Sequence, residues 1–103
     1  MDLKTGQRLR SRVCTTEAIV IKAVPGDVDL RSGGVPMGPI EEVTETGGSP
    51  APGFDTGTQL GKRYVIADGT SLELLVTKPG AGSLSVGEQP LTVKGAKPLP
   101  ASD

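Results

Sequence analysis

Two stretches decide how this chain folds: residues 14–37, CTTEAIVIKAVPGDVDLRSGGVPM, and residues 68–91, DGTSLELLVTKPGAGSLSVGEQPL. In each stretch an apolar run meets a Pro-Gly turn, a shorter apolar run returns, and a Gly-x-x-Pro exit follows. Aligned without a gap, they match at Thr16/Thr70, Pro25/Pro79, Gly26/Gly80, Leu30/Leu84, Gly33/Gly87 and Pro36/Pro90. A repeat at fixed spacing indicates a repeated structural unit, so we predict one small β unit used twice.

The apolar residues follow strand patterns. Residues 17–23 are apolar on both sides, as expected of a strand covered on both faces. Residues 71–77 alternate, which predicts that Glu73 points outward and its leucine neighbours point inward. Further strands are predicted at residues 7–13, 28–31, 62–67, 82–86 and 91–93. No segment combines a 3.6-residue apolar period with a cap, so the predicted fold class is all-β with no substantial helix.

The predicted architecture is two repeated three-stranded units packed as a pseudo-symmetric pair within one compact domain. The first unit covers residues 1–37 and the second covers residues 61–93. Residues 38–60 are an acidic connector whose glycines and prolines disfavour regular structure. Residues 94–103 are predicted to be an extended tail.

Composition restricts the class of protein. The chain of 103 residues has one Tyr, one Phe, no Trp, 15 Gly and 9 Pro, so its core must be thin and aliphatic. Small domains of this kind usually need further support, and we expect an oligomer or a larger partner. A net charge of −1 gives no general attraction to nucleic acid or to anionic lipid.

The single cysteine, Cys14, excludes a disulfide within the chain. No apolar leader follows Met1, and no apolar run reaches transmembrane length. We therefore expect a cytoplasmic protein that does not bind membranes.

Arginines alternate along the first predicted strand. Arg8, Arg10 and Arg12 would share one face of residues 7–13. Such a row can dock an anion or an acidic partner. The alternative is a solvated strand face whose arginines pair with cross-strand acids such as Glu17.

Phe54 is the other candidate for an interaction. It is the only Phe, and it lies in the connector. An aromatic side chain in such a loop can pin the loop to the body of the protein, or it can anchor a partner.

The first stretch resembles the desulforedoxin module, a small β unit also found at the N-terminus of desulfoferrodoxins. That module has Cys-x-x-Cys on its first strands and, after a Gly-rich hairpin, a Cys-Cys-Gly-x-x-Met segment that often has Pro before the Met. Here Ser11-Arg12-Val13-Cys14 aligns with the first signature and Ser32-Gly33-Gly34-Val35-Pro36-Met37 with the second. The resemblance covers residues 6–37 and extends weakly, through the repeat, to residues 61–91.

The resemblance implies a metal scaffold that has lost its metal. The family binds one iron through four cysteine sulfurs, and the matching positions here are Ser11, Cys14, Ser32 and Gly33. One thiol and no His cannot supply four soft ligands, so no metal and no cofactor are expected. The family also forms dimers of its module, which implies that two copies in one chain pack against each other through apolar faces.

Several interpretations of Cys14 stay open: a reactive thiol, a lone metal ligand, a partner in an interchain disulfide, or a small packed residue. Packing is favoured because no His is present to activate the thiol, and only Arg10 and Arg12 are near in sequence. Asp27 and Asp29 are better explained as solvated turn acids than as cation ligands.

The function predicted from these features is a non-catalytic accessory or interaction subunit, assembled with copies of itself or with a larger protein. It would bind through an edge strand, the arginine row or the Phe54 loop. No phosphate loop, His-based triad or aromatic-rich basic surface is present, so neither an enzyme nor a nucleic-acid-binding protein is expected. The alternative function is a redox or metal protein in which Cys14 acts with groups from another chain.

Overall fold

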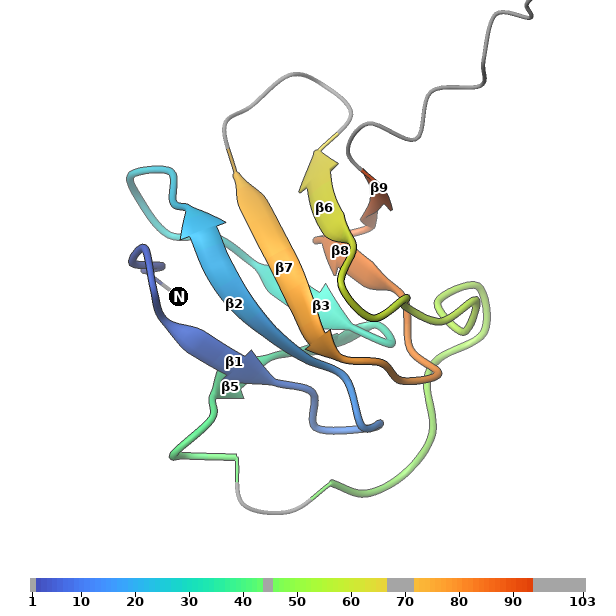
Figure 1. Cartoon of the computed structure of the whole chain (residues 1–103). Helices are drawn as coiled ribbons and strands as arrows, with labels where there is room; N and C mark the ends of the chain where they lie inside the picture. Colours follow the sequence, from blue (N-terminus) through green and yellow to red (C-terminus); the bar gives the residue numbers. More distant parts are fainter. Residues whose placement is uncertain (1, 44–45, 67–71, 94–103) are drawn as a thin grey trace, which may run out of the picture.

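A computed structural model describes residues 2–43, 46–66 and 72–93 of the chain (Figure 1). Across these ranges the protein is all-β and has no helix, which confirms the predicted fold class and leaves no helix there that could cross a membrane. The strands are β1 (Arg8–Arg10), β2 (Glu17–Lys22), β3 (Leu30–Ser32), β4 (Val35–Pro36), β5 (Gly38–Pro39), β6 (Arg63–Ile66), β7 (Glu73–Lys78), β8 (Leu84–Val86) and β9 (Gln89–Val93).

The nine strands form one antiparallel sheet that almost closes on itself. Their order is β4-β3-β8-β9-β6-β7-β2-β1-β5. The two end strands, β4 and β5, are consecutive in the chain with only Met37 between them, so the ends of the sheet meet. Figure 1 shows β2 and β7 at the front of the resulting barrel and β3 and β8 behind them.

This closure leaves little free edge. The strands at the two ends of the sheet are two residues long in the described part of the chain. A partner that adds a strand needs a row of unpaired backbone groups, and such short edges provide few. The end strands therefore offer few unpaired backbone groups for the predicted docking through an edge strand.

Inward-facing aliphatic side chains fill the barrel. Leu9, Leu30 and Leu74 are 1% exposed or less. Val20 on β2 pairs with Leu74 on the adjacent strand β7, and both side chains are buried in the core. Tyr64 is the one aromatic residue in this cluster, and its hydroxyl accepts the backbone N–H of Gln59 at 2.9 Å. Aliphatic packing thus replaces the aromatic residues that the composition lacks.

The first strand is shorter than predicted. β1 ends at Arg10 instead of continuing to residue 13. The reason is local: Ser11 Oγ accepts the backbone N–H groups of both Val13 and Cys14 at 3.2 Å, and this turns the chain. The connector also begins later than predicted, because Gly38 pairs with Arg10 as part of β5.

One prediction of burial was wrong, and one outward-facing residue is covered on its own face. Glu73 lies on the same face of β7 as Leu75, as the alternation predicts, yet it is 2% exposed, and its Oε2 lies 3.3 Å from Arg63 Nη1. On β2, Ala18 is buried but Ile19 is only half-buried, so one face of this strand is covered, not two. A barrel has a single interior, so only one face of β2 can enter the core.

Two ladders each contain one pair of residues whose separation equals the offset of the two sequence stretches. Val20 pairs with Leu74 between β2 and β7, and Arg31 pairs with Ser85 between β3 and β8. Each of these pairs joins residues 54 positions apart, which is the spacing of the two sequence stretches. The β3–β4 ladder has a counterpart of the same register in the β8–β9 ladder. That the two halves are equivalent units stays a prediction.

Candidate functional site around Cys14

Three segments meet at the sulfur of Cys14. They are the turn between β1 and β2, the end of β3, and the turn between β7 and β8. Cys14 Sγ lies 3.3 Å from Ser11 Oγ, 3.2 Å from Thr16 Oγ1 and 3.6 Å from Ser32 Oγ. The backbone N–H of Gly82 donates to the same sulfur at 3.4 Å. The sulfur thus faces three hydroxyl groups and one amide.

Glycines make this close approach possible. A Cβ on Gly80 would lie 2.5 Å from the backbone N of Thr16 and 3.0 Å from Cys14 Sγ. A Cβ on Gly82 would lie 2.9 Å from the backbone N of Gly33 and 3.2 Å from the sulfur. Backbone atoms cannot yield at such distances, so only glycine lets the turn after β7 reach the sulfur.

A chain of hydroxyl groups stands behind the sulfur. The backbone N–H of Gly80 donates to Thr58 Oγ1 at 3.1 Å, and Thr58 Oγ1 lies 3.1 Å from Thr16 Oγ1. Thr16 and Thr58 are both buried. The Thr58 hydroxyl also donates to the carbonyl of Gly80 at 3.5 Å, and the neutral thiol of Cys14 donates to Thr16 Oγ1. Once the thiol is ionised, the Thr16 hydroxyl can turn its proton to the sulfur.

These donors act on the acidity of the thiol. Partial burial raises the pKa of Cys14, but hydrogen bonds from the Ser11 and Thr16 hydroxyls, the Thr16 backbone and the Ser32 hydroxyl outweigh it. The pKa falls from 9.0 to about 7. The hydroxyls favour the charged form because each can donate a proton to a thiolate. About half of the sulfur is therefore ionised near neutral pH.

The four positions singled out by the resemblance lie together. Ser11, Cys14 and Ser32 share the sulfur contacts, and Gly33 lies beside them with its N–H donated to the carbonyl of Ser83 at 2.9 Å. Within residues 2–43, 46–66 and 72–93, no group of three or more His, Cys, Asp or Glu side chains is placed to hold a metal ion. One thiolate beside alcohol oxygens is a poor donor set for zinc or iron.

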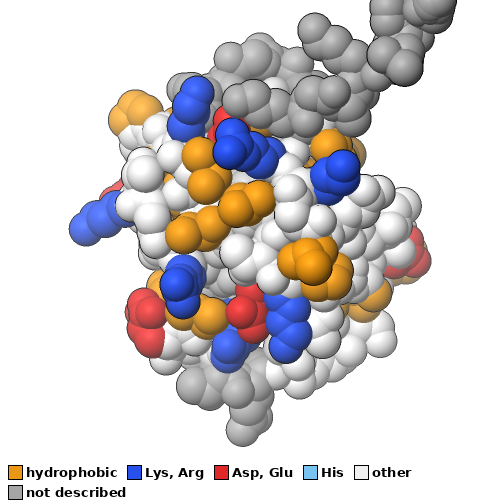
Figure 2. Space-filling model, viewed as in Figure 1, with side chains coloured by type: hydrophobic (Ala, Val, Ile, Leu, Met, Phe, Trp, Pro, Cys, Tyr) orange, Lys and Arg blue, Asp and Glu red, His pale blue; other side chains and the backbone are white. Residues whose placement is uncertain are grey.

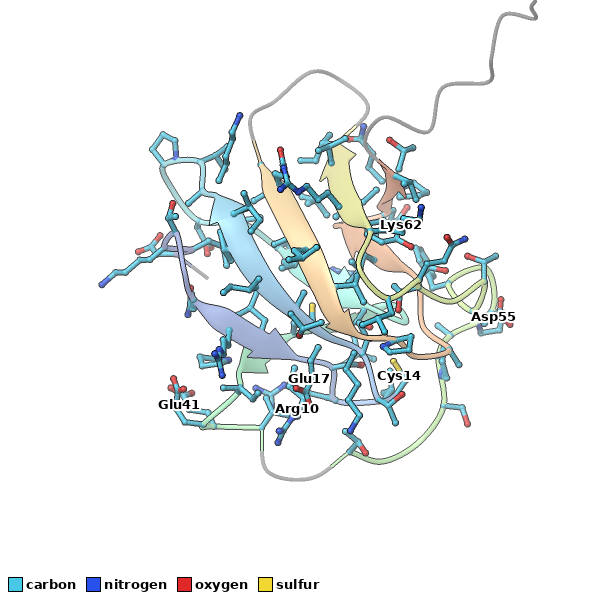
Figure 3. The ribbon with its side chains drawn as sticks, in the orientation of Figure 1. Arg10, Cys14, Glu17, Glu41, Asp55 and Lys62 are labelled. Atoms are coloured by element: carbon cyan, nitrogen blue, oxygen red, sulfur yellow. The ribbon has the colours of Figure 1, made fainter. Side chains whose placement is uncertain are left out.

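A hollow of about 190 Å³ opens beside the thiol, and Arg10, Glu17 and Lys78 line it. Arg10 Nε lies 3.2 Å from Glu17 Oε2, and Arg10 Nη1 donates to the carbonyl of Val43 at 2.7 Å. Figure 3 shows Arg10 and Glu17 next to each other, with Cys14 at the same end of the barrel. The cross-strand pairing with Glu17 that the sequence suggested is thus present for Arg10.

The predicted row of arginines is divided. Arg8 and Arg10 both belong to β1, and Arg8 is exposed. Arg12 lies beyond the end of β1, where a Cβ on Gly38 would be 2.6 Å from its Nη2. Because the chain turns at Ser11, the strand face joins Arg8 and Arg10 and leaves Arg12 outside.

Phe54 lies against the body of the barrel. Its backbone carbonyl accepts the N–H of Ser83 at 2.8 Å, and a Cβ on Gly34 would be 3.4 Å from its ring. The half-buried ring lines a groove of about 480 Å³ together with Tyr64 and Leu91. These contacts connect the Phe54 loop to the turn between β3 and β4, to the residue before β8, and to β9.

Sequence reasoning missed part of this site. Thr16 and Gly80 match their partners in the repeat, and the repeat indicates only a structural role for them. Thr58 gave no sequence signal, because its role depends on a contact with a residue 42 positions away. The usable signal was the pair of glycines after Pro79, which permits close backbone approach.

Comparison with known protein families, with curated proteins and with solved structures found no match.

Proposed function

We propose that the chain is a non-catalytic interaction module that binds a larger protein or further copies of itself. The observation that carries this proposal is a ladder row on the outer face of four adjacent strands. It joins Arg8 on β1 to Ile19 on β2, Ile19 to Leu75 on β7, and Leu75 to Arg63 on β6. The two apolar residues in the middle are half-buried, and no further strand or helix of the described residues lies over them.

The surface around this row supports the proposal. Figure 2 shows hydrophobic side chains in the middle of the face over β2 and β7, with Lys and Arg side chains around them. Interfaces combine an apolar centre with a polar rim in this way. Of the residues first considered for binding, Arg8 lies in the row, Arg10 lies at its edge, and Arg12 and Phe54 lie elsewhere. A cytoplasmic location and partners other than nucleic acid and membranes belong to the same proposal.

The test is the assembly state of the native chain. The protein would be isolated under non-denaturing conditions, and the mass of the isolated species determined by light scattering and mass spectrometry. We expect an oligomer, or a stoichiometric complex with a second protein. A chain that is monomeric both in native extract and after purification, across the concentration range tested, would contradict the proposal.

The proposal includes an origin for the fold: an internally duplicated, degenerate desulforedoxin-like module. It is supported by the 54-residue spacing of the pairs Val20–Leu74 and Arg31–Ser85. It is also supported by the meeting of Ser11, Cys14 and Ser32 at one point. Apolar contacts between β2 and β7 would then hold the fold together, as a bound metal does in the family.

A second candidate function is a redox or metal protein in which Cys14 acts with groups from another chain. One specific observation favours it: the hydroxyls of Ser11, Thr16 and Ser32 converge on a half-exposed sulfur and lower its pKa to about 7. Thiolates are the reactive and metal-binding form of cysteine.

The two candidates separate in one preparation. Metal content and the visible spectrum of the native complex would be measured, and Cys14→Ala would be compared with the unchanged chain. An interaction module keeps its partner after this substitution and loses at most about 2–3 kcal/mol of stability. A stoichiometric metal, or loss of a measurable redox activity in Cys14→Ala, would favour the second candidate.

A further inference from the structure

We propose that the outer face of β1, β2, β7 and β6 binds an acidic segment of a partner protein, which inserts an apolar side chain between Ile19 and Ile40. This inference rests on the proposed function and gives it a surface and a partner chemistry. Three independent features of the face lead to it: its ladder rows, a hollow and its charge.

The ladder registers place two apolar residues between two arginines in one row. Arg8, Ile19, Leu75 and Arg63 are consecutive neighbours across four strands, so their side chains share the outer face. The next row toward the Cys14 end joins Arg10, Glu17 and Lys78. A partner on this face would meet aliphatic side chains at the centre and cations on both sides.

A hollow of about 340 Å³ opens beside the apolar row. Ile19 and Ile40 supply apolar walls, Thr77 lies on its β7 side, and Arg8 and Lys78 stand among its lining residues. It lies where the β2–β7 ladder shifts register between Glu17 and Ala18. A bulge of this kind bends the strands locally and re-aims side chains, so the hollow belongs to the fold itself.

The hollow continues toward the thiol. The hollow of about 190 Å³ beside Cys14 shares Glu17 and Lys78 with it. Together they follow the face from Ile40 to Cys14. An extended segment is the shape that fits two adjoining hollows, and a single compact side chain fills only one.

The charge of the face selects an acidic occupant. Arg8, Arg10 and Lys78 line the two hollows against the single carboxylate of Glu17, which Arg10 already pairs with. Within residues 2–43, 46–66 and 72–93, neither Arg8 nor Lys78 forms an ion pair. The whole chain has a net charge of −1, so the positive face is a local arrangement. Opposite charge across an interface guides association and register.

The same charges disfavour a second copy of this face as the occupant. Two copies docked face to face by a two-fold axis would bring the cations of one row against those of the other. Like charges in contact cost binding energy. In an acidic segment with apolar residues at alternate positions, the apolar side chains can enter the hollow and the carboxylates can pair with the cations around it.

The direct test uses a synthetic peptide of alternating glutamate and leucine, titrated into the isotope-labelled full chain and followed by NMR. A glutamate–serine peptide and a lysine–leucine peptide serve as controls. We expect saturable shifts of the Arg8, Ile19 and Leu75 amides with the glutamate–leucine peptide only, weakening as salt is added. Shifts confined to other strands, equal shifts with the lysine–leucine peptide, or no shifts would overturn the inference.

A charge reversal provides the second measurement. Arg8→Glu is expected to weaken binding of the glutamate–leucine peptide about ten-fold or more, because a rim attraction becomes a repulsion. Lys62→Glu is the matched control: it makes the same change from cation to anion outside both hollows, and Figure 3 shows Lys62 on the β6 side. Equal weakening by both variants, or none by either, would overturn the inference.

The inference and the proposed function fail in distinguishable ways. If the native chain is found in a complex that Arg8→Glu leaves intact, the proposed binding face is wrong, but the proposed function as an interaction module stands. If the native chain has no partner and does not self-assemble, the function itself is wrong.

Discussion

The strongest prediction concerns Ser11, whose hydroxyl joins the fold to the chemistry of Cys14. Ser11 Oγ accepts two backbone N–H groups, from Val13 and Cys14, and lies 3.3 Å from the sulfur. The neutral thiol donates to this oxygen, and once Cys14 is ionised the hydroxyl proton of Ser11 can be donated to the sulfur instead. Ser11→Ala removes that donor, and we expect the pKa of Cys14 to rise.

The size of the change follows from the donors present. A hydrogen bond to a charged group contributes about 1.5–3 kcal/mol, and one pH unit corresponds to about 1.4 kcal/mol. Cys14 is partly exposed, so solvent screening favours the lower end, about one pH unit. At pH 7 the ionised fraction would fall from about one half to about one tenth. Alkylation by iodoacetamide would slow about five-fold, because the thiolate is the reacting form.

The pH dependence of stability has a definite sign. The folded pKa of about 7 lies below the ordinary value of 9.0, so ionisation of Cys14 stabilises the folded state. This stabilisation is complete above pH 9 and is lost as the pH falls through 7. The stability difference between the unchanged chain and Ser11→Ala should therefore grow as the pH is raised from 7 to 9.

The assay is a pH titration of the alkylation rate and of thiolate absorbance, in parallel with denaturant unfolding at each pH. Ser85→Ala is the control: Ser85 is also fully buried, but its hydroxyl donates to the carbonyl of Gly87 at 3.1 Å and not to the sulfur. The reasoning would be refuted if the unchanged chain titrated near 9, or if both variants moved the pKa equally.

Three further predictions test the packing. Gly80→Ala should destabilise the protein by about 1–3 kcal/mol in denaturant unfolding, since its Cβ would meet backbone atoms, whereas Gly47→Ala, with open space around it, should cost little. Leu74→Ala should lower the free energy of unfolding by about 2–5 kcal/mol because it opens a cavity between β2 and β6, and a loss below 1 kcal/mol would mean that the core is not packed as described. Tyr64→Phe should cost about 1 kcal/mol by leaving the N–H of Gln59 without its acceptor, and an unchanged unfolding midpoint would contradict that bond.

Local patterns predicted much of the fold. The alternation around Leu74 and the β-branched run at residues 17–23 predicted β7 and β2 to within a few residues. Prediction was wrong where a side chain competed with the ladder, as when Ser11 ended β1, and it gave no sign that Glu73 would be covered on the outer face beside Arg63. Neither effect has a periodic signature in the sequence.

The candidate site was predicted only through the resemblance. Ser11, Cys14, Ser32 and Gly33 were considered together because they align with four cysteines, not because any pattern brings them together. The amide of Gly82, from the second stretch, reaches the sulfur, and Thr58, from the connector, stands behind it through Thr16. Without that alignment, nothing in the sequence predicts that these four residues lie together.

The sequence by itself determined the structural elements of this protein: strands and no helices, Pro-Gly turns between strands, and an aliphatic interior. These follow from spacing over a few residues and from side-chain shape, which the chain expresses locally. Only the tertiary structure decided that the ends of the sheet meet and that an amide of Gly82 reaches a sulfur 68 positions earlier. Those contacts depend on the order in which strands pair, and that order is fixed by how the whole set buries its apolar faces at once.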